Sequence, residues 1–183
     1  MSLPTLEAFL NVAAQTVTLH ETGPEAPCAL TQWLAKTVPW IQVHATQGPA
    51  PRTLCLRGPN SHGTIQFVGD LAHRMIEPLA ITVRALGTGQ VDLDTPATPV
   101  FLSELVRPVH LRLVVSVACP YCPASAAVVL RLACITDKVH VQIIRADLED
   151  APRVHAVPTL FVGNEELLTG PMAEMAVVEA IAR

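Results

Sequence analysis

Residues 110–123, HLRLVVSVACPYCP, decide the fold class of this chain. Residues 110–117 are rich in β-branched side chains and predict a strand that is buried towards its end. A Cys-Pro-Tyr-Cys motif follows, and residues 124–135 are apolar almost throughout. Such a run predicts a helix that other parts of the protein must cover on most sides. A Cys-X-X-Cys motif between a buried strand and a helix is typical of a redox site.

The two cysteines of the motif have different predicted roles. Cys119 lies where the free N–H groups and the dipole of the following helix stabilise a thiolate, so we expect it to be the nucleophile. Cys122 is close enough to resolve a mixed disulfide, and Pro120 shapes the turn between them. The alternative is a metal site, either structural zinc or transport of a soft ion such as Cu(I). A closed zinc site needs two more ligands, and the chain has neither a second Cys-X-X-Cys nor a His-X₃₋₅-His pair. We therefore favour redox chemistry and predict no metal.

The rest of the second half continues as an α/β unit. Residues 139–146 alternate in polarity and predict a strand, and the short polar segment Asp147–Val154 predicts either a loop or a helical turn. Strands at 159–162 and 165–168 flank the hairpin turn Gly163-Asn164, and a helix at 172–182 follows.

The first half shows the same order of elements more faintly. We expect strands at 17–20, 40–45, 53–57 and 64–68, and helices at 26–37 and 71–86. Asp70 is predicted to cap the helix at 71–86, Gly87 to end it and Pro78 to kink it. Extra helices are expected at 3–15 and 101–106. Three further cysteines, Cys28, Cys55 and Cys134, are expected to serve packing.

The segment Val157-Pro158-Thr159 makes the comparison specific, because Pro158 follows Cys119 by 39 residues and precedes the hairpin. CPYC after a strand, followed by Val-Pro-Thr before a hairpin and a final helix, resembles the thioredoxin superfamily. The resemblance implies that Pro158 is cis and lies against the cysteine pair. It also implies that the substrate contacts come from Pro120, Tyr121, Val157, Pro158 and Thr159.

A longer resemblance runs from Ile65 to Gly89 and from Val157 to Ile181. These segments look like the N-terminal domain of the alkyl hydroperoxide reductase flavoprotein subunit, and archaeal-type protein disulfide oxidoreductases share its tandem plan. The resemblance implies an α/β protein made of two fused thioredoxin-like folds, with central mixed β-sheets flanked by helices. We expect a degenerate first fold without a cysteine pair at 1–95, a connector at 96–108, and the redox-active fold at 109–183.

Composition limits the remaining choices. Twelve Lys+Arg residues against sixteen Asp+Glu give a net charge of −4, which does not favour nucleic-acid binding. No apolar run is long enough to span a membrane, and the N-terminus does not resemble a secretory signal, so we expect a cytoplasmic protein.

The expected function is thiol–disulfide oxidoreduction without a bound cofactor, because the chain has no Gly-X-Gly-X-X-Gly motif for flavin or nicotinamide. The expected partners are a protein disulfide, such as that of a peroxiredoxin, and a flavoprotein or other reductase that recharges the pair. The alternative is a non-catalytic thioredoxin-like binding or scaffold module.

Overall fold

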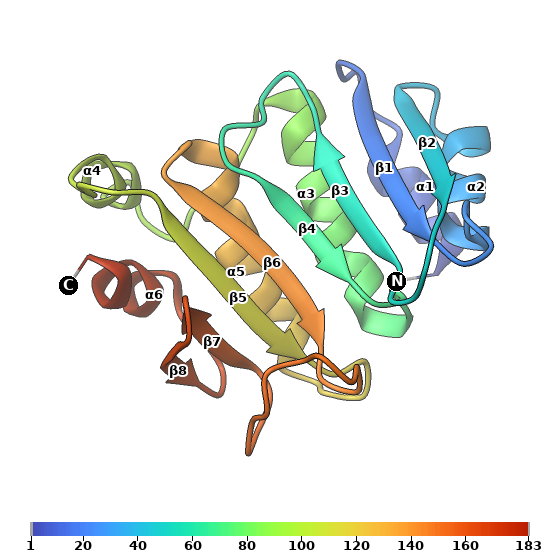
Figure 1. Ribbon diagram of the computed structural model, residues 1–183. Helices are drawn as coiled ribbons and strands as arrows, with labels where there is room; N and C mark the ends of the chain where they lie inside the picture. Colours follow the sequence, from blue (N-terminus) through green and yellow to red (C-terminus); the bar gives the residue numbers. More distant parts are fainter. Residues whose placement is uncertain (1, 183) are drawn as a thin grey trace.

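The computed structural model describes residues 2–182, apart from the side chain of His73, and it contains one eight-stranded mixed sheet. The strands are β1 (Val17–Gly23), β2 (Ile41–Gln47), β3 (Thr53–Arg57), β4 (Ile65–Val68), β5 (Val109–Val115), β6 (Val139–Arg145), β7 (Thr159–Val162) and β8 (Glu165–Thr169). Their spatial order is β2-β1-β3-β4-β6-β5-β7-β8 (Figure 1).

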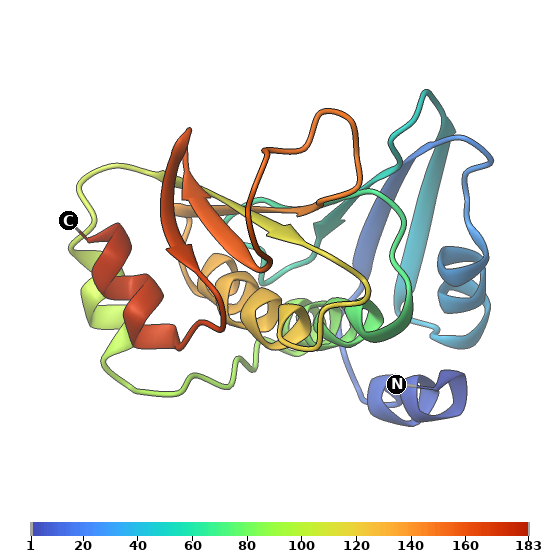
Figure 2. The ribbon, with the colours of Figure 1, turned by 90° about the horizontal axis from the view of Figure 1, so that it is seen from below.

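The helices are α1 (Leu3–Leu10), α2 (Ala29–Thr37), α3 (Ile76–Thr88), α4 (Thr98–Ser103), α5 (Cys122–Ile135) and α6 (Glu174–Ile181), and a 3₁₀ turn, η1 (His73–Met75), precedes α3. Helices α3 and α5 lie side by side on one face of the sheet, whereas the segment between β6 and β7 projects from the other face (Figure 2). No helix in the described part of the chain is long and apolar enough to cross a membrane.

The sheet consists of two copies of one arrangement. In the first copy β1 pairs in parallel with β2 and antiparallel with β3, and β4 pairs antiparallel with β3. In the second copy β5 pairs in parallel with β6 and antiparallel with β7, and β8 pairs antiparallel with β7. The copies meet where β4 pairs with β6 in parallel, with Ile65 opposite Val141 and Val68 opposite Ile144. The two predicted sheets are therefore joined into one. The first four strands lie within residues 1–95, α4 within 96–108 and the last four strands within 109–183.

The position of α5 explains why its sequence is apolar almost all round. The helix packs against β5 and β6 above it, and against α3 and α6 on its flanks. Val129, Leu130 and Leu132 are fully buried as a result. The first half of the chain shields α5 through α3, as expected from the sequence.

The boundaries at the start of α3 differ from the prediction. Asp70 does not cap a helix, because its carboxylate pairs with Arg52, and the chain passes through η1 before α3 begins at Ile76. Pro78 therefore lies in the first turn of α3, where its missing N–H has no partner to lose and no kink is needed. Gly89, at φ 74°, ends the helix instead of Gly87.

The other helices begin or end at different residues than predicted. Helix α1 ends at Leu10 rather than near Gln15, and α4 occupies Thr98–Ser103 rather than 101–106. Helix α6 starts at Glu174, whose carboxylate accepts hydrogen bonds from the Asp94 N–H at 3.1 Å and the Thr98 hydroxyl at 2.5 Å. These bonds fasten the connector to the second fold.

Candidate functional site

The Cys119–Cys122 pair lies between the end of β5 and the first turn of α5, as the sequence predicts. Both cysteines are free thiols, and the backbone N–H of Cys122 donates to Cys119 Sγ at 3.1 Å. Cys119 is 9% exposed and Cys122 is fully buried. A sulfur that accepts a backbone N–H at the N-terminus of a 14-residue helix is well placed to carry negative charge. Cys119 is therefore the thiol that another molecule can reach.

The buried thiol of Cys122 resists ionisation. The pKa of Cys122 is raised to about 12, mainly by burial and in addition by the hydrogen bond with Cys119. A hydrogen bond with the backbone of Ser116 acts in the opposite direction. At neutral pH Cys122 therefore keeps its proton, which it can give up when it attacks a disulfide.

Residues 157–159, which the resemblance places against the cysteine pair, do lie next to Cys119. The Cys119 thiol donates to the carbonyl of Val157 at 3.5 Å, and the Val157–Pro158 peptide bond is cis. Pro158 and Thr159 are buried. The Thr159 hydroxyl donates to the Ala156 carbonyl at 2.8 Å, so its side chain braces the loop.

The outer rim of the site is formed by two residues of the motif itself. Tyr121 is 59% exposed and Pro120 is also exposed, so both can touch a partner as expected. Ser116 is a contributor that the sequence reasoning missed. Its carbonyl accepts the Cys119 N–H at 3.1 Å and its hydroxyl accepts the Ala118 N–H at 3.3 Å. A serine directly after a buried strand is a turn signal that could have indicated this role.

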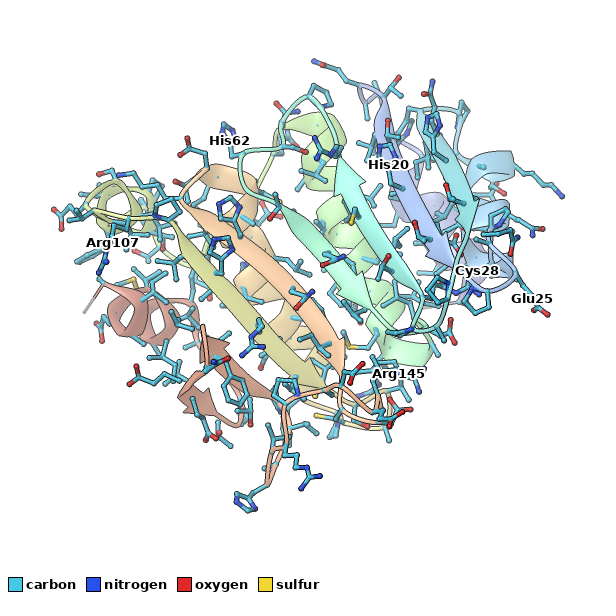
Figure 3. The ribbon with its side chains drawn as sticks, in the orientation of Figure 1. His20, Glu25, Cys28, His62, Arg107 and Arg145 are labelled. Atoms are coloured by element: carbon cyan, nitrogen blue, oxygen red, sulfur yellow. The ribbon has the colours of Figure 1, made fainter. Side chains whose placement is uncertain are left out.

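The remaining cysteines lie away from the motif. Cys134 is buried in α5, and burial raises its pKa to about 12. The expectation that Cys55 belongs to the core was wrong, because it is only partly buried, on the sheet face opposite the helices. Cys28 lies at the start of α2, in the first half of the chain (Figure 3). Within the described residues, no cluster of three or more His, Cys, Asp or Glu side chains is arranged to hold a metal ion.

Comparison with known proteins identifies the fold. No protein-family model and no curated protein matches the sequence. Among solved structures, the NTD_N/C domain of alkylhydroperoxide reductase AhpF from Enterococcus faecalis aligns with a TM-score of 0.81 and 16% identity, over 97% of this chain and 96% of that chain. A protein disulfide oxidoreductase from Aeropyrum pernix aligns with a TM-score of 0.75 and 16% identity, over 98% of this chain and 90% of that one. These likenesses confirm the tandem thioredoxin-like fold.

Proposed function

We propose that this protein is a thiol–disulfide oxidoreductase that cycles Cys119 and Cys122 between the dithiol and the disulfide. The observation that carries the proposal is the asymmetry of the pair, in which the accessible Cys119 Sγ accepts the N–H of the buried Cys122. The similar solved structures, an AhpF domain and a protein disulfide oxidoreductase, support the same class.

The proposed reaction has two exchange steps. The Cys119 thiolate attacks one sulfur of a substrate disulfide, which forms a mixed disulfide and releases the other substrate sulfur as a thiolate. Cys122 then attacks Cys119 Sγ, so the Cys119–Cys122 bond forms and the bond to the substrate breaks. The proton of Cys122 balances the charge of the departing thiolate. The substrate leaves as a dithiol, and a separate reductase returns two electrons to the pair.

The same proposal assigns the surrounding residues and partners. The Val157 carbonyl and Pro158 position the substrate sulfur opposite Cys119, while Tyr121 and Pro120 contact the surface around the substrate disulfide. We propose a protein disulfide as the substrate, with a peroxiredoxin as one candidate. A flavoprotein is the candidate reductase, and the reaction occurs in the cytoplasm.

Turbidity during insulin reduction by dithiothreitol tests the proposal directly. We expect the wild-type protein to accelerate the reaction and Cys119→Ser to abolish the acceleration. Reduced Cys122→Ser, freed of dithiothreitol before it is mixed with insulin, should accumulate a mixed disulfide that is visible on a non-reducing gel. Cys55→Ser is the matched control and should behave as wild type, because this thiol is only partly buried and lies away from the pair. Equal rates with Cys119→Ser and wild type would favour the binding-module alternative.

A further inference from the structure

Strand β5 leads into residues 116–121, the loop that carries Cys119 and is called the redox loop below. The end of this strand pairs with the backbone of β6 at Arg145. Arg145 is the last residue of β6 and lies opposite Val115, the last residue of β5. The next N–H along, that of Ala146, donates to the Val115 carbonyl at 2.8 Å. Only Ser116, Val117 and Ala118 separate Val115 from Cys119. Any shift of the Arg145 backbone is therefore passed on to the point where the redox loop leaves the sheet.

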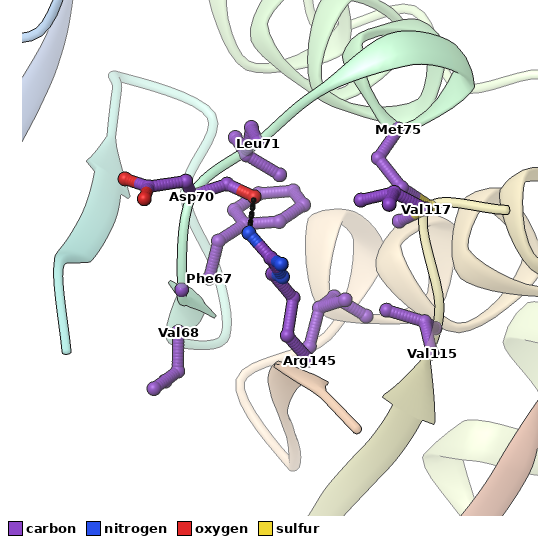
Figure 4. Close-up of a pocket in the computed structure, with 10 residues that line it drawn as sticks. Phe67, Val68, Asp70, Leu71, Met75, Val115, Val117 and Arg145 are labelled. Atoms are coloured by element: carbon purple, nitrogen blue, oxygen red, sulfur yellow. Dashed lines mark hydrogen bonds between the residues drawn. The ribbon is translucent and has the colours of Figure 1, made fainter. Parts of the chain in front are cut away.

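The side chain of Arg145 crosses to the first half of the chain and packs on the turn after β4. Gly69 has φ +97° there, and a Cβ on it would stand 2.7 Å from Arg145 Cδ. Only a glycine thus allows this close approach. Arg145 Nη1 donates to the Asp70 carbonyl at 3.2 Å (Figure 4).

This contact of the Arg145 side chain with the Gly69–Asp70 turn, called the clasp below, is held from both sides. Arg145 Nε also donates to Asp147 Oδ1 at 2.9 Å, which fixes the guanidinium in the second half. This pairing lowers the pKa of Asp147, so the carboxylate stays ionised at neutral pH. On the other side Arg52 Nε donates to Asp70 Oδ1 at 2.7 Å. The Gly69–Asp70 turn is therefore fixed by charged groups from both halves of the chain.

An apolar slot next to this clasp is lined by residues of the first half and by one residue of the redox loop. Its walls include Leu71 and Met75 from the first half and Val117 from the second (Figure 4). Met75 is only 1% exposed, so this wall is packed from behind. Val117 lies two residues before Cys119. The first half, which has no cysteine pair, thus lines the same slot as the segment that carries the nucleophile.

We infer that Arg145 is a positioning residue for the thiol–disulfide reaction, through its clasp on the Gly69–Asp70 turn. The clasp holds Leu71 and Met75 in place as walls of the slot that Val117 also lines, and so keeps Cys119 Sγ aligned with the Cys122 N–H and the Val157 carbonyl. The inference rests on the proposed function of the Cys119–Cys122 pair. It gives the first half a definite task, the support of the redox loop.

The test compares full-length Arg145→Ala with Arg84→Ala as a matched control. Arg84 Nη1 also donates to one backbone carbonyl at 3.2 Å, that of Phe9, but between α1 and α3. Two properties are measured: the rate of insulin disulfide reduction by the reduced protein, and the alkylation rate of Cys119 by iodoacetamide across pH. We expect Arg145→Ala to reduce insulin about tenfold more slowly, since small misplacements of reacting groups have effects of this order, and to shift the pH profile of alkylation. Arg84→Ala should leave both unchanged.

Urea unfolding of each variant shows whether it is folded. Leu71→Ala, which empties one wall of the slot at a partly buried position, replaces Arg145→Ala if the latter does not fold, and the same two changes are expected. A folded Arg145→Ala or Leu71→Ala protein with the wild-type alkylation profile would overturn the inference. If the wild type reduces no disulfide, the proposed function fails by itself, and the alkylation profile still decides whether Arg145 positions Cys119.

Discussion

Replacing Cys119 by serine isolates the second thiol of the pair and exposes its chemistry to measurement. Burial, the largest cause of the raised pKa of Cys122, remains in this variant. The pKa lies at about 12 in the folded protein, against an ordinary value of 9.0. At a pH of about 9, an ordinary thiol is about half ionised, whereas a thiol with this pKa is ionised to about one part in a thousand. Ionisation alone should therefore slow alkylation of Cys122 about 500-fold.

The assay is alkylation of Cys119→Ser by iodoacetamide across pH, with each cysteine read by mass spectrometry. Cys28 is partly buried and should react first, while Cys134, whose pKa is also raised to about 12 by burial, should stay unreacted with Cys122. In urea all four remaining thiols should react with one midpoint near the ordinary value. A folded-state midpoint for Cys122 near that of the unfolded chain would refute the reasoning. In that case Cys122 could be the attacking thiol, and the proposed order of the two steps would be reversed.

Substitutions at four further positions have definite expected outcomes. Glu174→Ala should lower the free energy of unfolding in urea by about 3 kcal/mol, because it removes the fully buried partner of the largely buried Arg131. Glu174→Gln should lower this free energy clearly less. Gly63→Ala should cost more than about 2 kcal/mol in the same measurement, since its Cβ would stand 1.7 Å from a backbone carbonyl oxygen at the start of β6, while Gly163→Ala, with open space but φ +60°, should cost only about 1 kcal/mol. Tyr121→Ala should leave stability within about 0.5 kcal/mol and raise the KM for a protein disulfide, because the ring is 59% exposed beside the reactive thiol; an unchanged KM would remove it from the contact surface.

Local patterns predicted the second half of the chain well. The strand 159–162 in the second half has the predicted bounds, as does the strand 53–57 in the first, because Pro and Gly turn signals lie on either side of each. The cysteine pair and the Val157–Pro158–Thr159 segment were also found from sequence. The residue types and spacing of the cysteine pair are local information, whereas the place of Val157–Pro158–Thr159 next to it was implied only by the resemblance to the thioredoxin superfamily.

Distant contacts explain the predictions that failed. Asp70 has the residue type and position of a helix cap, but its carboxylate is taken by Arg52 and its carbonyl by Arg145. Asp70 and Arg145 are 75 residues apart in sequence. No periodicity or motif relates two residues at that distance, and the pairing arises only because β4 and β6 become neighbours in the sheet.

In each half the N–H at the start of one helix donates to a side-chain acceptor, and the acceptor differs between the halves. In the second half the N–H of Cys122, at the start of α5, donates to the sulfur of Cys119. In the first half the N–H of Cys28, at the start of α2, donates at 2.9 Å to the carboxylate of Glu21, which is buried in β1.

The carboxylate of Glu21 also accepts a hydrogen bond from the Thr31 hydroxyl and pairs with Arg52. An anion that is already hydrogen-bonded and neutralised leaves the start of α2 with nothing to gain from a thiolate. The first half therefore holds a structural carboxylate at the start of its helix, where the second half holds a reactive sulfur. Arg52, which pairs with this carboxylate, also holds Asp70 in the clasp beside the redox loop.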